Sequence, residues 1–283
     1  MSVASSFDVA STDGVTIPVH DLGGDGPVLL MAHATGFHAK VWQPCAAHLR
    51  DFHCYAPDLR GHGDAVVPDG LGFSWHGFAE DLLAVIDAMG LEHVLAAGHS
   101  KGGAALLLAE LARPGTFRSL YLYEPVVFPP IDLLTASGPN PLADGAARRR
   151  EVFDSFDAAY DNFASKPPLD SLHPDALRAY VDHGFRPLAD GGIAIKCRPS
   201  VESEVYRMAS QHGAFERLAE VQCPVTIASG VELPFGPSSF ARDIVAALPH
   251  GHLESHHDLG HFGPLEDPET IASCIRRAAG RVT

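Results

Sequence analysis

The sequence predicts an α/β protein with a mostly parallel central sheet that is covered by helices on both faces. Three observations lead to this prediction. Short apolar runs of strand length alternate along the chain with longer segments of helical character. Several of these runs are apolar throughout, which is typical of strands buried on both faces. Hydrophobic residues make up 46% of the 283 residues and charged residues 19%, so a large core can form.

The first half of the chain supplies most of the expected strands. Residues 21–27 form a turn rich in Gly and Asp, and the continuous apolar run VLLMAH at 28–33 follows it as a buried central strand. Helices are expected near 40–49 and at 77–89, where apolar residues recur at helical spacing and Gly90 fits a C-cap. The strands expected in this half are residues 7–10, 15–19, 28–33, 53–57 and 93–98.

The alternation continues after residue 98 and is then interrupted. Residues 102–111, dense in Ala and Leu, predict a helix, and residues 118–123 predict a strand. Between 129 and 215 the chain contains proline pairs and polar helical segments but no convincing buried strand. The pattern resumes with strands at 224–229 and 251–255 and a last helix at 268–279. We therefore expect a core formed by residues 1–128 and 216–283, and a helical lid formed by 129–215.

The charge of the chain argues against polyanionic partners. The sequence has 20 basic and 35 acidic residues, a net charge of −15. Such a charge repels phosphate backbones and anionic membranes, and no basic run beyond Arg148, Arg149 and Arg150 offsets it. We expect a small molecule as the partner and neither nucleic acid nor a membrane; a homodimer is left open.

The cysteines and the first residues indicate a cytoplasmic protein. Five scattered cysteines, odd in number and without a C-x-x-C pair, suggest reduced thiols and not a disulfide framework. The N-terminal residues show no signal peptide, and no stretch of about 18 apolar residues is present. Four histidines crowd residues 250–257, but they alternate between strand faces and lack ligand-spaced cysteines or carboxylates. We expect no metal and no cofactor.

The stretch Gly98-His99-Ser100-Lys101-Gly102 fits the pattern G-x-S-x-G between a predicted strand and a predicted helix. Small residues two positions before and after the serine permit a sharp strand-to-helix turn. Such a turn exposes the serine hydroxyl at the head of the helix, where backbone N–H groups face a developing negative charge. The sequence therefore predicts Ser100 as a nucleophile.

Three further stretches, together with this turn, resemble the motifs of the α/β-hydrolase family in order and spacing. They are His33-Ala34-Thr35-Gly36-Phe37, the loop Asp58-Leu59-Arg60-Gly61-His62-Gly63-Asp64, and Gly260-His261-Phe262. The resemblance implies an α/β-hydrolase fold with Thr35 and Lys101 as the two amides of an oxyanion hole. It also implies His261 as the general base. Ala34 departs from the glycine usual in the family.

The resemblance leaves two candidates for the acid that orients His261. The family often has Gly-x-x-Asp after the strand at 224–229, but here that turn reads Gly230-Val231-Glu232-Leu233, with Glu232 one residue early. The other candidate is Glu124, which directly follows the strand at 118–123; some members of the family place the acid there. A poorly solvated carboxylate at that position needs a partner, and His261 would supply one.

The expected chemistry is acyl transfer through a Ser-His-Glu triad, with a small, largely hydrophobic ester or lactone as substrate. Phe37, Trp42 and Phe128 are expected to line the substrate pocket, between the strand ends and the lid. Three alternatives stay open: a hydrolase of carbon–carbon bonds, a cofactor-free lyase or oxygenase, and a ligand-binding homologue without turnover. A serine nucleophile disfavours the alkyl-enzyme chemistry of dehalogenases and epoxide hydrolases.

Overall fold

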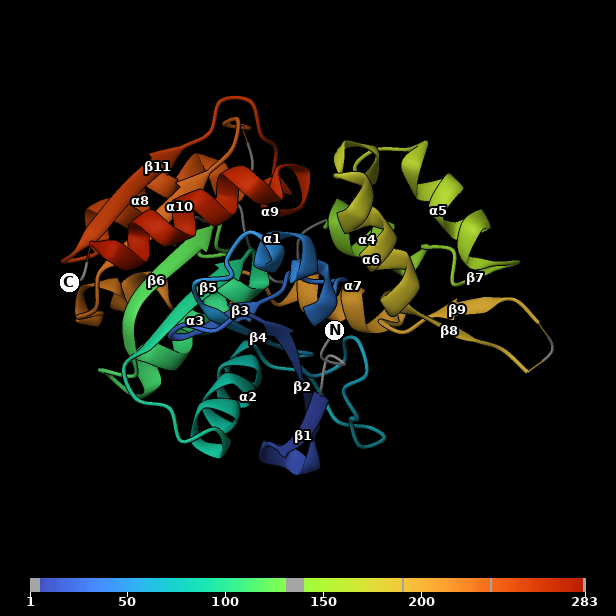
Figure 1. Cartoon of the computed structure of the whole chain (residues 1–283), viewed down its shortest axis with the longest axis horizontal. Helices are drawn as coiled ribbons and strands as arrows, with labels where there is room; N and C mark the ends of the chain where they lie inside the picture. The colour runs from blue at the N-terminus through green and yellow to red at the C-terminus, as the bar shows by residue number, and fades with distance from the viewer. Residues whose placement is uncertain (1–5, 131–139, 190, 235, 282–283) are drawn as a thin grey trace.

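A twisted eight-stranded sheet forms the centre of the computed structural model, which describes residues 6–130, 140–189, 191–234 and 236–281 (Figure 1). The strand order is β1-β2-β4-β3-β5-β6-β10-β11. β2 runs antiparallel to both of its neighbours, β1 and β4; from β4 to β11 every pair is parallel. The strands are β1 (Ser6–Ala10), β2 (Thr16–Gly23), β3 (Val28–Ala32), β4 (His53–Pro57), β5 (Val94–His99), β6 (Phe117–Tyr123), β10 (Val225–Ser229) and β11 (Gly251–Ser255). The predicted mostly parallel sheet is confirmed.

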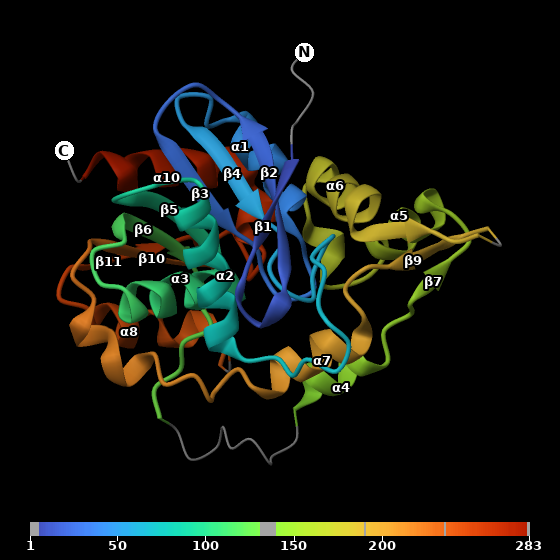
Figure 2. The ribbon, with the colours of Figure 1, turned by 90° about the horizontal axis from the view of Figure 1, so that it is seen from below.

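Helices cover both faces of this sheet (Figures 1 and 2). The helices α1 (Gln43–Ala47) and α10 (Pro268–Gly280) pack together on one face, and α2 (Trp75–Ala88), α3 (Lys101–Ala112) and α8 (Ala241–Ala247) lie on the other. Short helical turns are η1 (Thr12–Gly14), η2 (Ala39–Trp42), η4 (Phe215–Glu220), η5 (Pro237–Phe240) and α9 (Gly263–Glu266). In the described part of the chain, no helix is long and apolar enough to cross a membrane.

The central strands bury side chains on both sides, as their continuous apolar runs predict. Along β5, Val94 and Ala96 pack in the core beneath α2 and α3, whereas Leu95 and Ala97 pack in the core on the α1 and α10 face. This alternation follows from the two-residue period of a strand. Because β5 lies between β3 and β6, the turn that follows it opens at the middle of the sheet. Parallel α/β sheets commonly bind ligands at this edge.

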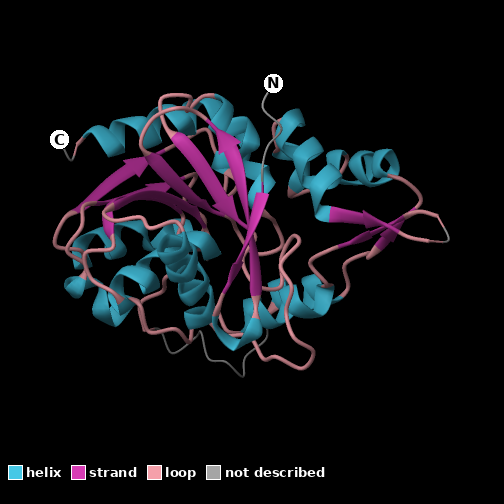
Figure 3. Cartoon of the chain, turned by 60° about the horizontal axis from the view of Figure 1, so that its bottom comes forward, coloured by secondary structure: helices cyan, strands magenta, loops and turns pink. Residues whose placement is uncertain are grey.

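The segment between β6 and β10 adds no described strand to the main sheet and forms a body of its own beside it (Figure 3). Its elements are α4 (Pro141–Ala147), β7 (Val152–Phe153), α5 (Phe156–Ala164), η3 (Leu169–Ser171), α6 (Pro174–Gly184), β8 (Phe185–Pro187), β9 (Ile193–Ile195) and α7 (Pro199–Arg207). The predicted helices are accompanied by a small antiparallel sheet of β7, β9 and β8, which the sequence did not predict. These strands are two or three residues long, too short for a periodic signal. Within the expected lid, residues 131–139 and 190 lie outside the described residues.

Candidate active site

Ser100 stands at a strained turn between β5 and α3. Its backbone has φ 54° and ψ −114°, a conformation that a residue with a side chain rarely adopts. The chain on either side is held to the strand next to it: Ser100 N–H donates to the Tyr123 carbonyl at 3.0 Å, and Val126 N–H donates to the Ser100 carbonyl at 3.2 Å. The strain is therefore maintained by hydrogen bonds between neighbouring segments.

The two glycines of the G-x-S-x-G stretch are required by the close approach of backbone around this turn. A Cβ on Gly98 would lie 2.7 Å from Gly103 N, and a Cβ on Gly102 would lie 2.2 Å from the carbonyl oxygen of Ala32 in β3. Both contacts are with main-chain atoms, which cannot rotate away as a flexible side chain could. The motif therefore reflects the packing of α3 against β3 and β5.

Replacing Gly102 with alanine is expected to lower the free energy of unfolding by at least about 3 kcal/mol, because the new methyl group overlaps the Ala32 carbonyl. Gly145 is a matched control, since it also lies in a helix but its Cβ would meet nothing within 4 Å. Gly145→Ala should raise stability by about 0.5–1 kcal/mol. Urea denaturation of both variants measures the difference. Equal effects of the two substitutions would contradict the steric explanation.

His261 and Glu124 form a short hydrogen bond beside this turn. The distance from His261 Nδ1 to Glu124 Oε2 is 2.6 Å. The other carboxylate oxygen of Glu124 accepts from Gly230 N–H at 2.9 Å, and the Glu124 residue is only 2% exposed. The His261 carbonyl oxygen is 2.8 Å from His99 Nε2, next to Ser100 in the chain. The structure thus brings the predicted nucleophile, base and acid to one place.

Glu124 reaches this position because β5 and β6 are parallel neighbours. His99 pairs with Tyr123 in their register, so the residues that follow, Ser100 and Glu124, leave the sheet side by side. Glu124 itself has φ 43°, a second left-handed residue at the same edge, and its N–H donates to the Ala228 carbonyl at 2.8 Å. This backbone bend directs its side chain across β10 toward His261.

The alternative acid, Glu232, is not brought to the histidine. It is exposed, and within the described residues it forms no hydrogen bond or ion pair with His261. The backbone preceding it is fixed, because Val231 N–H donates to the Leu259 carbonyl at 2.7 Å. Of the two glutamates, only Glu124 is hydrogen-bonded to His261 in the part of the chain that the structure describes. Among the described residues, no hydrogen bond joins Ser100 Oγ to the His261 ring. A hydrogen bond between nucleophile and base often forms only when the substrate is bound.

The turn at residues 33–37, where the sequence predicts one amide of an oxyanion hole, contains an N–H whose direction can be deduced. His33 Nε2 accepts from Leu59 N–H, so its Nδ1 carries the proton and donates to the Ala34 carbonyl at 2.8 Å. Because the trans peptide is planar, Thr35 N–H points away from that carbonyl. Gly36 has φ 79° and completes a turn in which Phe37 N–H donates to the Ala34 carbonyl. Thr35 N–H is therefore directed to the opposite side from His33.

Lys101 begins α3, and its side chain is fully buried. Its Nζ lies 3.3 Å from His62 Nδ1 and 4.5 Å from the centroid of the Phe78 ring. Burial lowers the pKa of Lys101 to about 7. Burial also holds the pKa values of His33 and His62 well below their usual range. The sequence drew attention to the Lys101 amide only and gave no sign of this buried ammonium.

The three predicted pocket residues lie in different surroundings. The Phe37 ring packs between Tyr180 of α6 and Phe262, with centroid distances of 5.1 and 5.5 Å. Phe262 in turn contacts His261 at 5.2 Å, so these rings form an apolar wall from α6 to the candidate base. Trp42 is 1% exposed and lies in the same packed core cluster as Phe37 and Tyr180.

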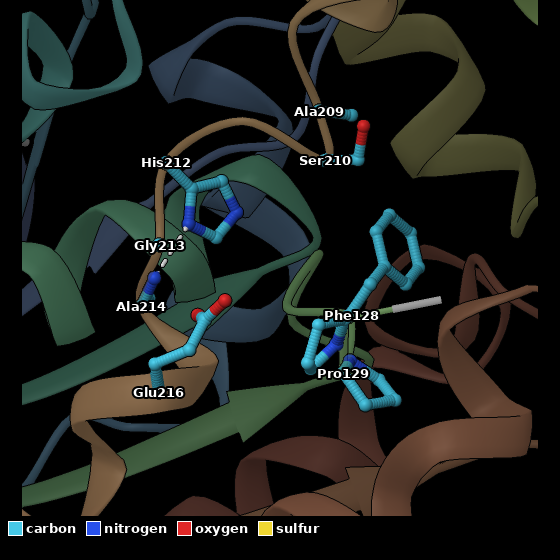
Figure 4. Close-up of a pocket in the computed structure, with 9 residues that line it drawn as sticks. Phe128, Pro129, Ala209, Ser210, His212, Gly213, Ala214 and Glu216 are labelled. Atoms are coloured by element: carbon cyan, nitrogen blue, oxygen red, sulfur yellow. Dashed lines mark hydrogen bonds between the residues drawn. The ribbon is translucent and has the colours of Figure 1, made fainter. Parts of the chain in front are cut away.

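Phe128 lines a separate cavity of about 120 Å³ (Figure 4). Its other walls come from Pro129 and Pro130 and from the chain between α7 and the first turn of η4, including His212 and Glu216. The Phe128 ring also packs edge-on against Phe240 at 5.5 Å. The structure therefore does not group Phe128 with the apolar wall that Phe37 and Phe262 form.

Two groups of described residues bring potential metal ligands together: Glu254, His256 and Cys274, and His20, Asp58 and Asp64. In the first group, Arg277 lies 3.3 Å from Glu254 and 2.9 Å from Cys274 Sγ. This guanidinium already supplies the positive charge that a cation would bring. In the second, Asp58 accepts from His20 and from the backbone of Ala39 and Asp64, which holds the loop in place.

The comparison with known families agrees with this geometry. The model of the alpha/beta hydrolase family matches residues 29–273. The chain belongs to the alpha/beta hydrolase family. Its esterase, lipase and lactonase relatives support a hydrolytic activity.

Two relatives illustrate the range of the matches. The chain is 32% identical over 169 residues to lipase LipV of Mycobacterium tuberculosis, a match that covers 59% of this chain and 57% of the lipase. It is 24% identical over 291 residues to 3-oxoadipate enol-lactonase 1 of Acinetobacter baylyi, covering 95% of each. The first match thus leaves more than a third of the relative uncovered, whereas the second extends over nearly the whole of both proteins.

Solved structures share the fold over the full length. The crystal structure of E-2-(acetamidomethylene)succinate hydrolase has a TM-score of 0.81 at 22% identity, covering 98% of this chain and 100% of the other. The esterase RhEst1 from Rhodococcus sp. has a TM-score of 0.75 at 20% identity, covering 99% and 100%. At these identities the likeness establishes the alpha/beta hydrolase fold.

Proposed function

We propose that this alpha/beta hydrolase is a serine hydrolase with the triad Ser100, His261 and Glu124. The observation that carries the proposal is the 2.6 Å hydrogen bond from His261 Nδ1 to a buried Glu124, formed beside the strained Ser100 turn. A carboxylate on Nδ1 fixes the imidazole tautomer and leaves Nε2 as the proton acceptor. Structural glycines and hydrogen bonds hold the participating backbone in place.

In the proposed mechanism, His261 Nε2 takes the proton of Ser100 Oγ as the oxygen attacks the carbonyl carbon of the substrate. The negative charge on the carbonyl oxygen is bound by the N–H groups of Thr35 and Lys101. The imidazolium, stabilised by Glu124, then protonates the leaving oxygen, and the acyl group remains on Ser100. A water molecule that gives its proton to the same imidazole releases the acid and regenerates the serine.

The proposed substrate is a small, largely hydrophobic carboxylic ester or lactone. The apolar wall of Phe37, Tyr180 and Phe262 next to His261 supports an apolar acyl or alcohol group. Relatives named as a lipase and as an enol-lactonase act on bonds of this class by their names. We propose the segment between β6 and β10 as the lid of this site, because Tyr180 belongs to it.

We further propose that the enzyme works on a free small molecule in a reducing compartment, the cytoplasm. Its five cysteines are buried free thiols, and a net charge of −15 disfavours polyanionic partners.

Reaction with a fluorophosphonate probe tests the proposal. The expected result is a single covalent adduct on Ser100, located by peptide mass spectrometry, with no adduct in a Ser100→Ala variant. Hydrolysis of p-nitrophenyl acetate in ¹⁸O-labelled water should place one labelled oxygen in the acetate produced. A folded protein that gives no adduct on Ser100 would overturn the assignment of the nucleophile. Ester turnover without label would indicate acyl transfer to something other than water.

A further inference from the structure

Lys101 carries an ammonium group that the proposed mechanism does not use. The side chain is buried and contacts the Phe78 ring and His62 Nδ1. Throughout the described ranges, no carboxylate forms an ion pair with Lys101. A buried ammonium without such a partner lowers stability, because burial disfavours the charged form. A chain that needed only to fill this space would be more stable with methionine or leucine there.

The position of the His62 ring proton depends on the charge of Lys101. His62 Nδ1 faces the Arg60 carbonyl oxygen at 2.9 Å and Lys101 Nζ at 3.3 Å. An ammonium can only donate, so it requires a bare Nδ1 and places the proton on Nε2, which is buried and has no hydrogen-bond partner. A neutral amine instead allows Nδ1 to carry the proton and to donate to the Arg60 carbonyl. Loss of the charge on Lys101 therefore favours the other tautomer of His62.

His33 links this pair to the turn at residues 33–37. The ring centroids of His62 and His33 are 5.3 Å apart. His33 Nδ1–H donates to the carbonyl of the peptide unit whose N–H belongs to Thr35. Positive charge on the carbonyl side of a peptide polarises it and strengthens its N–H as a donor on the other side. The ammonium thus lies on the carbonyl side of the peptide unit that carries Thr35 N–H.

We propose that the Lys101 ammonium is a positioning group of the oxyanion hole, which acts through His62 and His33 on the peptide that carries Thr35 N–H. The inference rests on the proposed function, in which that N–H binds the oxyanion. Lys101 then contributes twice to the oxyanion hole. Its main-chain N–H binds the oxyanion, and its side chain acts from the carbonyl side of the peptide that carries Thr35 N–H. The side chain does not touch the substrate, so its effect should appear in kcat and not in KM.

The titratable groups around Lys101 come from several elements. They are His33 after β3, Asp58 and His62 after β4, Asp81 of α2, and Cys197 before α7. Burial keeps both histidines neutral and raises the pKa of Cys197 to about 12, whereas hydrogen bonding holds the pKa of Asp58 far below neutrality. Since burial brings the pKa of Lys101 to about 7, it is the member of this set that changes charge between pH 6 and 9.

The test compares wild type with Lys101→Met, which keeps the main-chain N–H and the length of the side chain but removes the charge. At pH 6, kcat for p-nitrophenyl acetate should fall roughly tenfold with KM within about twofold. In general, one unit charge roughly 12 Å from a developing charge changes a rate by about tenfold at an effective dielectric constant of about 20. The ratio of the two rates should approach one as the pH rises to 9, because wild type then loses the same charge. Any change of rate with pH that the two proteins share cancels in the ratio.

Thermal unfolding separates this role from a structural one. The folded state lowers the pKa of Lys101, so between pH 7 and 10 the unfolded state binds more protons and wild type gains stability as the pH rises. Lys101→Met should therefore have a higher Tm than wild type at pH 6, and this difference should shrink toward pH 10. A lower Tm together with a lower kcat would mean that Lys101 is structural and would overturn the proposal.

The outcomes distinguish this proposal from the proposed function. If wild type shows no fluorophosphonate adduct on Ser100, the proposed function fails, and this inference with it. If wild type reacts on Ser100 and Lys101→Met reacts at the same rate at pH 6, only the role of Lys101 is refuted. Should Lys101→Met not fold, Lys101→Gln, which keeps a neutral polar group, is expected to show the same kinetics. Failure of both variants to fold would also overturn the proposal.

Discussion

Ser100→Ala is expected to lower kcat for p-nitrophenyl acetate by at least about 10³-fold while the protein remains folded. The hydroxyl is the proposed nucleophile, and neither His261 nor a bound water can replace it in forming an acyl-enzyme. Ser100→Gly should lose as much activity and gain stability, because glycine adopts φ 54° and ψ −114° without the strain that a Cβ imposes. We expect Ser100→Gly to be more stable than Ser100→Ala by about 1–3 kcal/mol.

Thermal unfolding and initial rates of both variants measure these effects. The pair separates chemistry from folding, since the two substitutions remove the same hydroxyl but differ in backbone strain. Retention of more than a tenth of wild-type kcat in either folded variant would exclude Ser100 as the nucleophile. Equal stability of the two variants would show that the turn stores no strain.

The fold could be predicted from the sequence because each strand and helix is indicated by residues close together in the chain. Continuous apolar runs indicate strands buried on both faces, and helix α3 follows directly from the Ala and Leu after Gly102. The glycines around Ser100 were predicted for the right physical reason, since a Cβ at Gly98 or Gly102 would overlap main-chain atoms. Glycines in motifs of this kind are required by close backbone contacts, so these contacts can be predicted from the sequence alone.

Other features depend on contacts between residues far apart in the chain. Lys101 and His62 meet because α3 packs against the loop after β4, and no local pattern distinguishes this buried lysine from an exposed helix residue. Phe37, Trp42 and Phe128 are assigned to the pocket for their aromatic character alone. The structure places Trp42 in the core cluster of Phe37, and it places Phe128 at another cavity, a difference that depends on how distant segments pack. The small sheet of β7, β9 and β8 consists of strands too short to leave a periodic signal.

The choice between two acids also required three-dimensional information. The sequence placed Glu124 and Glu232 after neighbouring strands, both at the same edge of the sheet. What separates them is the register of β5 and β6 and the bend at Glu124, which together turn its carboxylate toward His261. Glu232 follows a turn fixed by the Val231 hydrogen bond and stays at the surface.

Glu124→Gln should lower kcat by about 10²–10⁴-fold, whereas Glu232→Gln should stay within about twofold of wild type. A glutamine at 124 has one oxygen for two N–H groups, His261 Nδ1–H and Gly230 N–H. If its oxygen faces Gly230, its NH₂ group faces Nδ1 and moves the ring proton to Nε2, so the imidazole cannot accept the proton of Ser100. If its oxygen faces His261, the NH₂ group opposes Gly230 N–H and strains the turn.

The two variants make the same chemical change, at a buried glutamate that contacts His261 and at an exposed one that does not. Rates with p-nitrophenyl acetate, measured with equal fractions of folded protein, give the comparison, and the phosphonylation rate of Ser100 should fall in parallel for Glu124→Gln. Two mild losses would mean that neither glutamate orients the histidine. A severe loss confined to Glu232→Gln would require the 230–233 turn to move toward His261 on binding substrate, and the 2.6 Å contact with Glu124 would then be structural.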